Sequence, residues 1–407
     1  MAGTRMNLMA ATAFKNWLLA RPVPARVVAT PLFLASLSEL QAAFITYQTD
    51  QIGMIADTRV FDDSFLPPDP LHREAETEQL LRRFTTTHPR ASDVLISGPS
   101  GVGKTLLARN AVNHLETQTD ITRVFVDSLG KTTGDVLRCV LEELPRGSND
   151  VPQTLPTTDA CRQLRDAITD ETIIVLDEGE DLPQTNAISE LLAIENVTVV
   201  AIVHDGTDWL SRLDVTDGHR LDQGHLKLDR YGVDELADIL ERRARQGLHG
   251  DPVMRAQLEA IADEVAGVAR EGIQSLRAAA ELAHERGHRR IRDRDVDDSY
   301  ERAKRRIRQL NLQSLPYHHQ VLYSIIHDAG EITGEKLHDR YEVAAEVVYS
   351  GSPVQPLGKR ARRGKLPKLQ AYDLIDYDGP TRDRLYWVVD EKIEPVARIG
   401  TETLNSK

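Results

Sequence analysis

One short run of the chain has the residue types and spacing needed to hold a phosphate chain. It fits the pattern G-x-x-x-x-G-K-[ST] in full and consists of Gly98, Pro99, Ser100, Gly101, Val102, Gly103, Lys104 and Thr105. Glycines let backbone N–H groups wrap phosphate oxygens, and a helix that begins there points its positive end at them. Lys104 would reach the β- and γ-phosphates, and Thr105 would ligate Mg²⁺. The run therefore predicts a P-loop that binds ATP and Mg²⁺.

A second chemical signal is an apolar run, 173–176, that ends in the two acids Asp177 and Glu178. After a P-loop, such a strand end lies beside the phosphates, and its first carboxylate can hold Mg²⁺. The second carboxylate can polarise the attacking water. We therefore expect Asp177 to be a metal ligand and Glu178 to be catalytic.

The run Gly267-Val268-Ala269-Arg270 begins a predicted helix far along the chain. An arginine there can reach the γ-phosphate across a domain cleft and couple the nucleotide to closure of a lid. Arg270 thus joins Lys104 and Glu178 as a candidate catalytic residue, and it is also a candidate nucleotide ligand.

The elements that must position these residues follow an alternating pattern. Apolar runs of strand length alternate with helical periodicity, which predicts a parallel sheet covered on both faces. The expected strands are 93–97, 123–127, 172–177, 197–203 and 225–228. The fold class is therefore α/β, and we place this nucleotide-binding base at 54–228.

Beyond the base, the strands stop and four helical segments with charged faces predict a helical lid at 229–312. From 313 to 394 the pattern is three helices followed by two short strands, which is the layout of a winged helix. Residues 395–407 are expected to be a tail. Residues 1–53 hold few acids, and we interpret them as a disordered extension or as a segment upstream of the true start codon.

The densest basic run falls on the third predicted helix of the winged helix, the one expected to enter the major groove. Arg362 and Arg363 are candidates for contacts to guanine edges, and Lys359, Lys365 and Lys368 for contacts to phosphates. The full set of candidate DNA ligands is Lys359, Arg360, Arg362, Arg363, Lys365, Lys368 and, at the wing tip, Arg382 and Arg384. Pro367 is expected to end or bend this helix near Leu366.

Composition limits the partners. The net charge of -13 argues against a general nucleic-acid binder, so DNA must be held by a local basic patch. Arginine in excess of lysine with abundant acids is typical of halophilic proteins. The two cysteines, Cys139 and Cys161, form no zinc pattern, and no apolar run approaches the roughly 20 residues that span a bilayer. We expect a cytoplasmic, nucleoid-associated protein with no membrane partner.

Taken in order, these motifs resemble those of the archaeal initiators related to the largest origin recognition complex subunit and to the cell division control helicase loader. The resemblance runs from about residue 55 to 389 and includes the segment Phe61-Asp62-Asp63-Ser64-Phe65-Leu66-Pro67, which precedes the P-loop. In that family this segment lines the adenine pocket. The resemblance implies an AAA+ base, a helical lid and a C-terminal winged helix. It also implies ATP-controlled binding to origin DNA, with recruitment of the replicative helicase and other initiator subunits.

The chain departs from the family pattern at several positions. His204 stands where the family places an asparagine that senses the γ-phosphate and is our candidate for that role. Gly179 and Glu180 replace an apolar residue and an aspartate, and the segment 182–196 is short. Arg220 is either a finger that reaches a neighbouring subunit's nucleotide or an ordinary surface arginine.

The sequence thus predicts an ATP-dependent, DNA-binding replication initiator of the archaeal origin-recognition type with weak ATPase activity. Two alternatives stay open. One is a nucleotide-locked DNA-binding regulator in which His204 has ended turnover. The other is a transposition- or partition-type AAA+ ATPase that acts on DNA without sequence choice.

Overall fold

The computed structural model describes residues 53–85, 92–147, 151–351, 354–380 and 384–397. All but Gly53 belong to one compact unit, Met54–Lys407. The extension predicted for residues 1–53 therefore lies outside the described residues, apart from Gly53, and so does most of the predicted tail.

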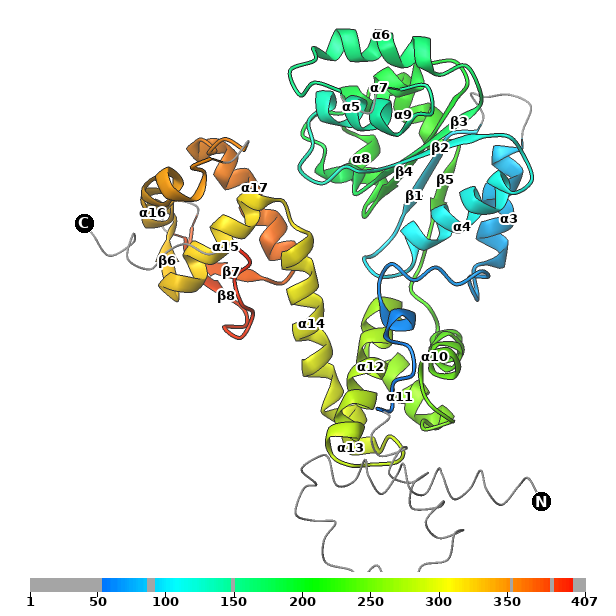
Figure 1. The fold of residues 1–407 in the computed structure, drawn as a ribbon, viewed down its shortest axis with the longest axis vertical. Helices are drawn as coiled ribbons and strands as arrows, with labels where there is room; N and C mark the ends of the chain where they lie inside the picture. Colours follow the sequence, from blue (N-terminus) through cyan, green and yellow to red (C-terminus); the bar gives the residue numbers. More distant parts are fainter. Residues whose placement is uncertain (1–52, 86–91, 148–150, 352–353, 381–383, 398–407) are drawn as a thin grey trace, which may run out of the picture. The chain divides into compact units, whose positions relative to one another are not determined.

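The base is built on a five-stranded sheet whose strand order is β2-β3-β4-β1-β5 (Figure 1). All four strand pairings are parallel. β4 is buried at six of its seven positions, as expected for a strand covered on both faces. The strands are β1 (Val94–Ser97), β2 (Thr122–Asp127), β3 (Thr172–Asp177), β4 (Val197–Val203) and β5 (His225–Lys227).

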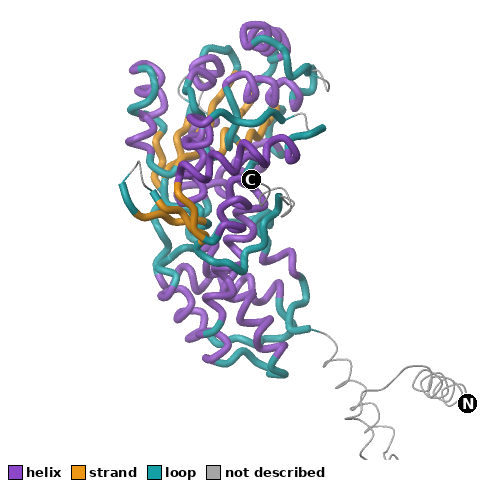
Figure 2. Tube along the Cα trace, turned by 90° about the vertical axis from the view of Figure 1, so that its left-hand side faces the viewer, coloured by secondary structure: helices purple, strands orange, loops and turns teal. Residues whose placement is uncertain are grey.

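Helices cover both faces of this sheet (Figures 1 and 2). One apolar core joins the sheet to α5, α6 and α7, and a second core on the other face joins it to α3 and α4. The helices of the base are α3 (Glu74–Phe84), α4 (Lys104–Glu116), α5 (Thr133–Glu143), α6 (Thr157–Ala167), α7 (Asn186–Leu192), α8 (Gly206–Leu210) and α9 (Val215–Asp222), with short 3₁₀ turns η1 (Thr58–Phe61) and η3 (Gly179–Asp181). The α/β prediction is confirmed.

A helical lid follows the base, with its own apolar core. Its helices are α10 (Val233–Gly247), α11 (Arg255–Glu264), α12 (Ala269–Glu285), α13 (Asp293–Asp297) and α14 (Ser299–Ser314). The turn η1 belongs to this core, since Phe61 is fully buried in it. Arg243 of α10 donates a 2.7 Å hydrogen bond to the carbonyl of Val60, and Gln274 of α12 donates one of 2.7 Å to that of Phe61. The segment before the P-loop is therefore fastened to the lid.

The C-terminal domain has the element order of a winged helix, and its three-stranded antiparallel sheet has the order β6-β8-β7. Its elements are α15 (Tyr317–Ala329), β6 (Glu331–Thr333), α16 (Gly334–Val348), α17 (Lys359–Ala371), β7 (Ile375–Asp378) and β8 (Leu385–Val388). Leu312 and Leu315, at the end of α14 and just beyond it, are buried in the core of this domain. The lid thus continues into the winged helix through one long helix.

Of the two outcomes expected at Pro367, an end or a bend of the helix near Leu366, the end is wrong, because α17 continues through Pro367 to Ala371. Proline removes one backbone donor, but it lies in the last turns of the helix. Leu366 and Leu369 on either side of it are buried, so packing holds the helix together there.

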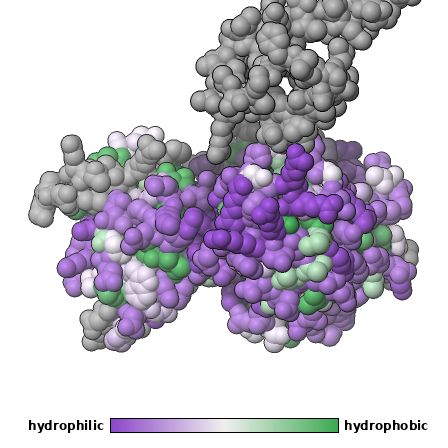
Figure 3. All heavy atoms as spheres, turned by 90° about the horizontal axis from the view of Figure 1, so that it is seen from below, coloured by the Kyte–Doolittle hydropathy of each residue, from purple (hydrophilic) through white to green (hydrophobic). Residues whose placement is uncertain are grey.

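On the face shown in Figure 3, the described residues are mostly hydrophilic, with hydrophobic residues scattered among them. Both cysteines are free thiols, Cys161 being buried. Among the described residues, no helix combines the length and the apolar character that crossing a membrane would require.

Candidate nucleotide-binding site

The predicted P-loop connects β1 to the first turn of α4. Gly101 and Gly103 have φ angles of 75° and 92°, in the left-handed region that favours glycine. At Gly98 a Cβ atom would lie 2.3 Å from the carbonyl oxygen of Leu228, so no side chain fits there. The glycines of the motif are therefore required by the backbone path that turns the loop into α4.

Lys104 is buried at the start of α4, and its Nζ donates hydrogen bonds of 2.8 Å to the carbonyl oxygens of Gly98 and Pro99. Burial lowers the pKa of Lys104, while the nearby carboxylates of Glu180, Glu178 and Asp177 act to raise it. The ammonium group thus lies inside the loop that would surround a phosphate chain.

Thr105 and Asp177 meet across the loop. The Thr105 hydroxyl donates a 2.9 Å hydrogen bond to Oδ2 of Asp177, at the end of β3. Burial raises the pKa of Asp177. A hydroxyl and a carboxylate in contact beside a lysine form the oxygen donor set that Mg²⁺ prefers, so these two residues fit the metal role that their sequence predicts.

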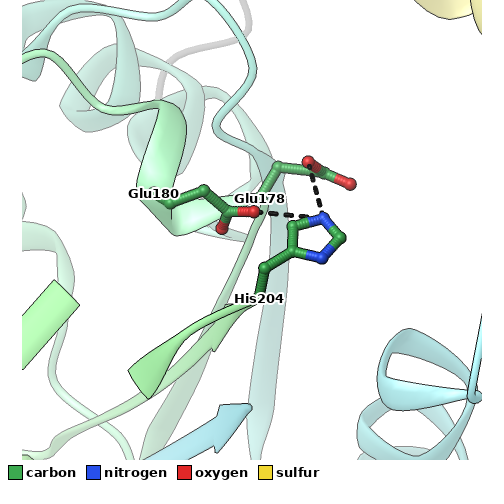
Figure 4. A group of neighbouring side chains, drawn as sticks. All are labelled: Glu178, Glu180 and His204. Carbon is green, nitrogen blue, oxygen red and sulfur yellow. Dashed lines mark ion pairs between the residues drawn. The ribbon is translucent and has the colours of Figure 1, made fainter. Parts of the chain in front are cut away.

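Glu178, Glu180 and His204 come together at the carboxyl ends of β3 and β4 (Figure 4). Nε2 of His204 lies 3.3 Å from Oε1 of Glu180 and 4.0 Å from Oε2 of Glu178. Burial lowers the pKa of His204 and raises that of Glu180 to about 7. Glu178 has a φ angle of 53°, an uncommon value for a non-glycine residue. His204 is therefore beside the predicted catalytic glutamate, where a neutral imidazole can donate or accept a hydrogen bond.

Arg270 lies at the start of α12, directly above the P-loop. Its backbone N–H donates a 3.2 Å hydrogen bond to the carbonyl of Gly101. Its guanidinium contacts Oδ2 of Asp63 at 2.7 Å and donates to Oδ1 of Asn311 at 2.8 Å. The lid arginine thus joins the P-loop, the segment before it and α14 at one point.

A cavity of about 560 Å³ lies between the P-loop, the segment before it and the lid. This volume is within the usual range for small-molecule sites. Phe61, Phe65, Ile239 and Ile273 supply apolar lining, and the guanidinium of Arg243 lies 4.5 Å from the centre of the Phe65 ring. The cavity opens onto Lys104, Thr105, Asp177, Glu178, His204 and Arg270.

The basic run lies on α17, but it does not form one surface. Lys359, Arg360 and Arg363 are exposed, and Lys365 is half-buried. Arg384, next to β8, is half-buried, with its guanidinium 4.1 Å from the centre of the Tyr377 ring. Arg382 lies outside the described residues.

The structure corrects two of the predicted DNA contacts. Arg362 is only 2% exposed and turns into the domain. Its guanidinium donates to Oε1 of Glu342 at 2.8 Å and to the carbonyl of His338 at 3.2 Å. Lys368 points toward the base, where its Nζ lies 2.6 Å from Oε2 of Glu178. Both cations have protein partners and face away from the exposed side of α17.

Arg220 is no free finger in this structure. Its Nε donates to the buried carboxylate of Asp93, and its Nη1 donates a 2.7 Å hydrogen bond to the carbonyl of Leu192. It is also not an ordinary surface arginine, since its side chain is only 17% exposed. Its contacts fasten α9 to the start of β1 and to the end of α7.

A P-loop between a parallel strand and a helix, an acidic strand end beside it and a helical lid above it define an AAA-type nucleotide-binding domain. Residues 89–213 match the AAA domain family, and residues 237–301 match the Cdc6 AAA+ ATPase-type lid domain.

Two curated relatives are ORC1-type DNA replication proteins 9 and 1 of Halobacterium salinarum. The first is 30% identical over 351 residues, which cover 85% of this chain and 97% of the relative. The second is 31% identical over 308 residues, which cover 71% of this chain and 95% of the relative. Among solved structures, the Aeropyrum pernix ORC1 protein in complex with DNA has a similar fold, with a TM-score of 0.63, 21% identity and coverage of 83% and 94%.

This chain belongs to the archaeal Orc1/Cdc6 family of ORC1-type DNA replication proteins. The resemblance inferred from the order of the motifs is confirmed.

Proposed function

We propose that this protein is a replication initiator that binds ATP between its base and lid and binds duplex origin DNA through its winged helix. Family membership supports a role in DNA replication. The observation that carries the proposal is the joining of a P-loop cleft, through α14, to a domain that exposes a basic helix. We further propose that the bound protein helps to recruit the replicative helicase and other initiator subunits.

In this proposal, Lys104 and the backbone N–H groups of the P-loop hold the phosphates, and Arg270 closes the lid over them. Mg²⁺, held by the Thr105 hydroxyl and the Asp177 carboxylate, would neutralise phosphate charge. Glu178 would orient the attacking water, and His204 would contact the γ-phosphate. Because Arg270 contacts both the P-loop and α14, the nucleotide can set the angle between base and lid, and with it the grip on DNA.

Hydrolysis in this proposal is slow, for two reasons. First, the neighbour of Glu178 is His204, where the family places an asparagine. Second, Oε2 of Glu178 is bound by the Lys368 ammonium. The same contacts favour a second candidate function, a nucleotide-locked DNA-binding regulator that does not turn over. A Glu178→Gln variant distinguishes the two: wild-type turnover equal to that of the variant means a locked regulator.

The DNA contacts are assigned to Lys359, Arg360, Arg363 and Lys365 on α17, with Arg384 at the wing. The three exposed cations at 359, 360 and 363 lie within the first two turns of the helix, whereas the protein as a whole is strongly acidic. Such a local patch can hold a polyanion that the rest of the surface repels.

The test is selection of genomic fragments by purified protein with ATP, at the salt concentration of the cell. Wild type should enrich a few sites, and an Arg360→Ala, Arg363→Ala double variant should lose that enrichment. The matched control is Arg289→Ala, Arg290→Ala, which removes two exposed arginines between α12 and α13. Uniform recovery of all fragments by wild type would instead indicate a DNA-acting ATPase without sequence choice.

A further inference from the structure

The contact of α17 with the nucleotide site is the starting point. Lys368 Nζ lies 2.6 Å from Oε2 of Glu178 and 2.5 Å from Oδ2 of Asp181. The same ammonium lies 4.6 Å from the centre of the Tyr372 ring, and the side chain is only 11% exposed. α17, the helix proposed to bind DNA, thus places the buried Lys368 ammonium against Glu178, the carboxylate proposed to be catalytic.

This ion pair changes what Glu178 can do. The Lys368 ammonium donates a 2.6 Å hydrogen bond to Oε2 of Glu178, so one oxygen of this carboxylate is already engaged. A carboxylate held by an ammonium is a weaker base and has one oxygen fewer for orienting water. The neighbouring carboxylates raise the pKa of Lys368 against the effect of its burial, so the ammonium stays charged near neutral pH.

Other contacts hold the winged helix against the base at this place. Leu129, in the loop after β2, is 7% exposed and is buried in the core of the winged helix, in the same cluster as Leu315. Nearby, a Cβ atom on Gly130 would lie 3.0 Å from the ring of Pro316. Lys368 therefore belongs to an interface between the two domains and is not an isolated surface pair.

We propose that Lys368 is an autoinhibitory latch, which keeps Glu178 from activating water until duplex DNA takes hold of α17. The proposal rests on the function proposed above, that Glu178 supports hydrolysis and that α17 binds DNA. Lys365 is one turn before Lys368 on the same helix, and the exposed cations at 359, 360 and 363 precede it. Lys368 is on the other side of the helix from these exposed cations, so phosphates that bind them would act on α17 as one rigid element and move it as a whole away from Glu178 and Asp181. Origin DNA would then act as the switch for hydrolysis.

The first experiment tests the contact itself and needs no enzymatic activity. A zero-length carbodiimide coupling on the full chain should join Lys368 to Glu178 or Asp181, as detected by peptide mass spectrometry. The Lys304–Glu301 pair within α14, 3.5 Å apart, is the internal reference. Duplex DNA should lower the Lys368 cross-link at least several-fold relative to the reference. No cross-link, or one that DNA leaves unchanged, overturns the latch.

The second experiment measures ATP turnover. Lys368→Gln should raise basal turnover by about tenfold, since a positioned general base contributes about 10²–10⁴-fold. The variant should also lose any further stimulation by duplex DNA. Lys336→Gln, an exposed lysine of α16, is the matched control and should behave as wild type. A Lys368→Gln variant that folds and turns over like wild type overturns the latch. If neither protein hydrolyses ATP, the proposed ATPase activity fails, and the cross-link alone decides whether DNA opens the contact.

Discussion

Arg220 and Asp93 form the most deeply buried ion pair between α9 and the sheet. Asp93 is fully buried, and its other oxygen accepts a 2.8 Å hydrogen bond from the N–H of Val199. Burial raises the pKa of Asp93 to about 6, although the Val199 hydrogen bond and the Arg220 charge act to lower it. The carboxylate is thus ionised at neutral pH mainly because its partners compensate for the loss of water.

Replacing Arg220 by alanine should therefore cost about 3 kcal/mol of folding free energy at pH 8, because it leaves a buried charge without its partner. A raised folded-state pKa means that the protonated carboxyl is favoured on folding below about pH 4, and that this advantage is lost as the pH rises through 6. The cost of Arg220→Ala should accordingly shrink at pH 5, where Asp93 can take up a proton.

Urea unfolding at pH 8 and pH 5 measures this difference. The matched control is Arg165→Ala, which breaks an exposed pair with Glu190 and should cost less than about 1 kcal/mol at both pH values. Equal losses of unfolding free energy in the two variants would mean that the buried Asp93–Arg220 pair stabilises the fold no more than an exposed pair does.

The neighbouring arginines 362 and 363 show where residue-level prediction stops. The basic run predicts a cationic helix correctly, but one position on a helix turns the side chain by about 100°. Arg363 is exposed, whereas Arg362 lies 4.6 Å from the centre of the Tyr341 ring inside the domain. The amphipathic signal is weak here because the buried face of α17 includes this arginine as well as leucines, so the run alone does not tell the two apart.

At the scale of elements, α15 carries a buried histidine that should make the winged helix sensitive to acid. His319 is 2% exposed, and its Nδ1 has no hydrogen-bond partner. Burial, with the charge of Lys365, lowers its pKa to about 3. An unfolded histidine titrates near 6.5, so below that pH the folded state binds fewer protons than the unfolded state at this position. The contribution of His319 to the free energy of unfolding is therefore lost progressively as the pH falls from 6.5 toward 3.

His319→Leu should remove this acid sensitivity. With pKa values of about 3 in the folded and 6.5 in the unfolded state, the wild-type histidine should lower the free energy of unfolding by about 2 kcal/mol between pH 8 and pH 5. The unfolding free energy of the C-terminal domain, followed by denaturant titration at both pH values, should fall less in the variant. His114→Leu, an exposed histidine of α4, serves as control and should keep the wild-type slope.

Elements whose burial pattern is strong were predictable, and short ones were not. β3 and β4 have the bounds that their apolar runs predict, because a strand buried on both faces must be apolar throughout. β6 was missed, since its three residues, Glu331–Thr333, show no periodicity of their own and pair with β8 only after the chain has folded back. α3 was missed as well, because only Leu80 of its residues is buried.

At the scale of the molecule, the site is built from segments that are far apart in the sequence. The P-loop, the acidic strand end and the lid arginine were predicted individually, since each has a local pattern. Asn311 and Lys368 reach the same place from two other segments and carry no such pattern. Their contribution follows from tertiary packing, which is why the link between the nucleotide and α17 is seen only in the folded structure.

The whole protein is acidic, so its affinity for DNA should come from the few cations that contact phosphates. The salt dependence of that affinity should then report how many such contacts form. Each phosphate neutralised contributes about -0.9 to the slope of log K against log salt concentration. Arg360→Ala, Arg363→Ala should therefore make that slope shallower by about 1.8 in a fluorescence anisotropy titration with duplex DNA. Arg362→Ala should leave the slope unchanged and lower the unfolding free energy instead, because its guanidinium is bound inside the domain. The opposite result would be a shallower slope with Arg362→Ala and an unchanged slope with the double variant. It would mean that DNA contacts the face of α17 that is buried here, and that the C-terminal domain rearranges when it binds.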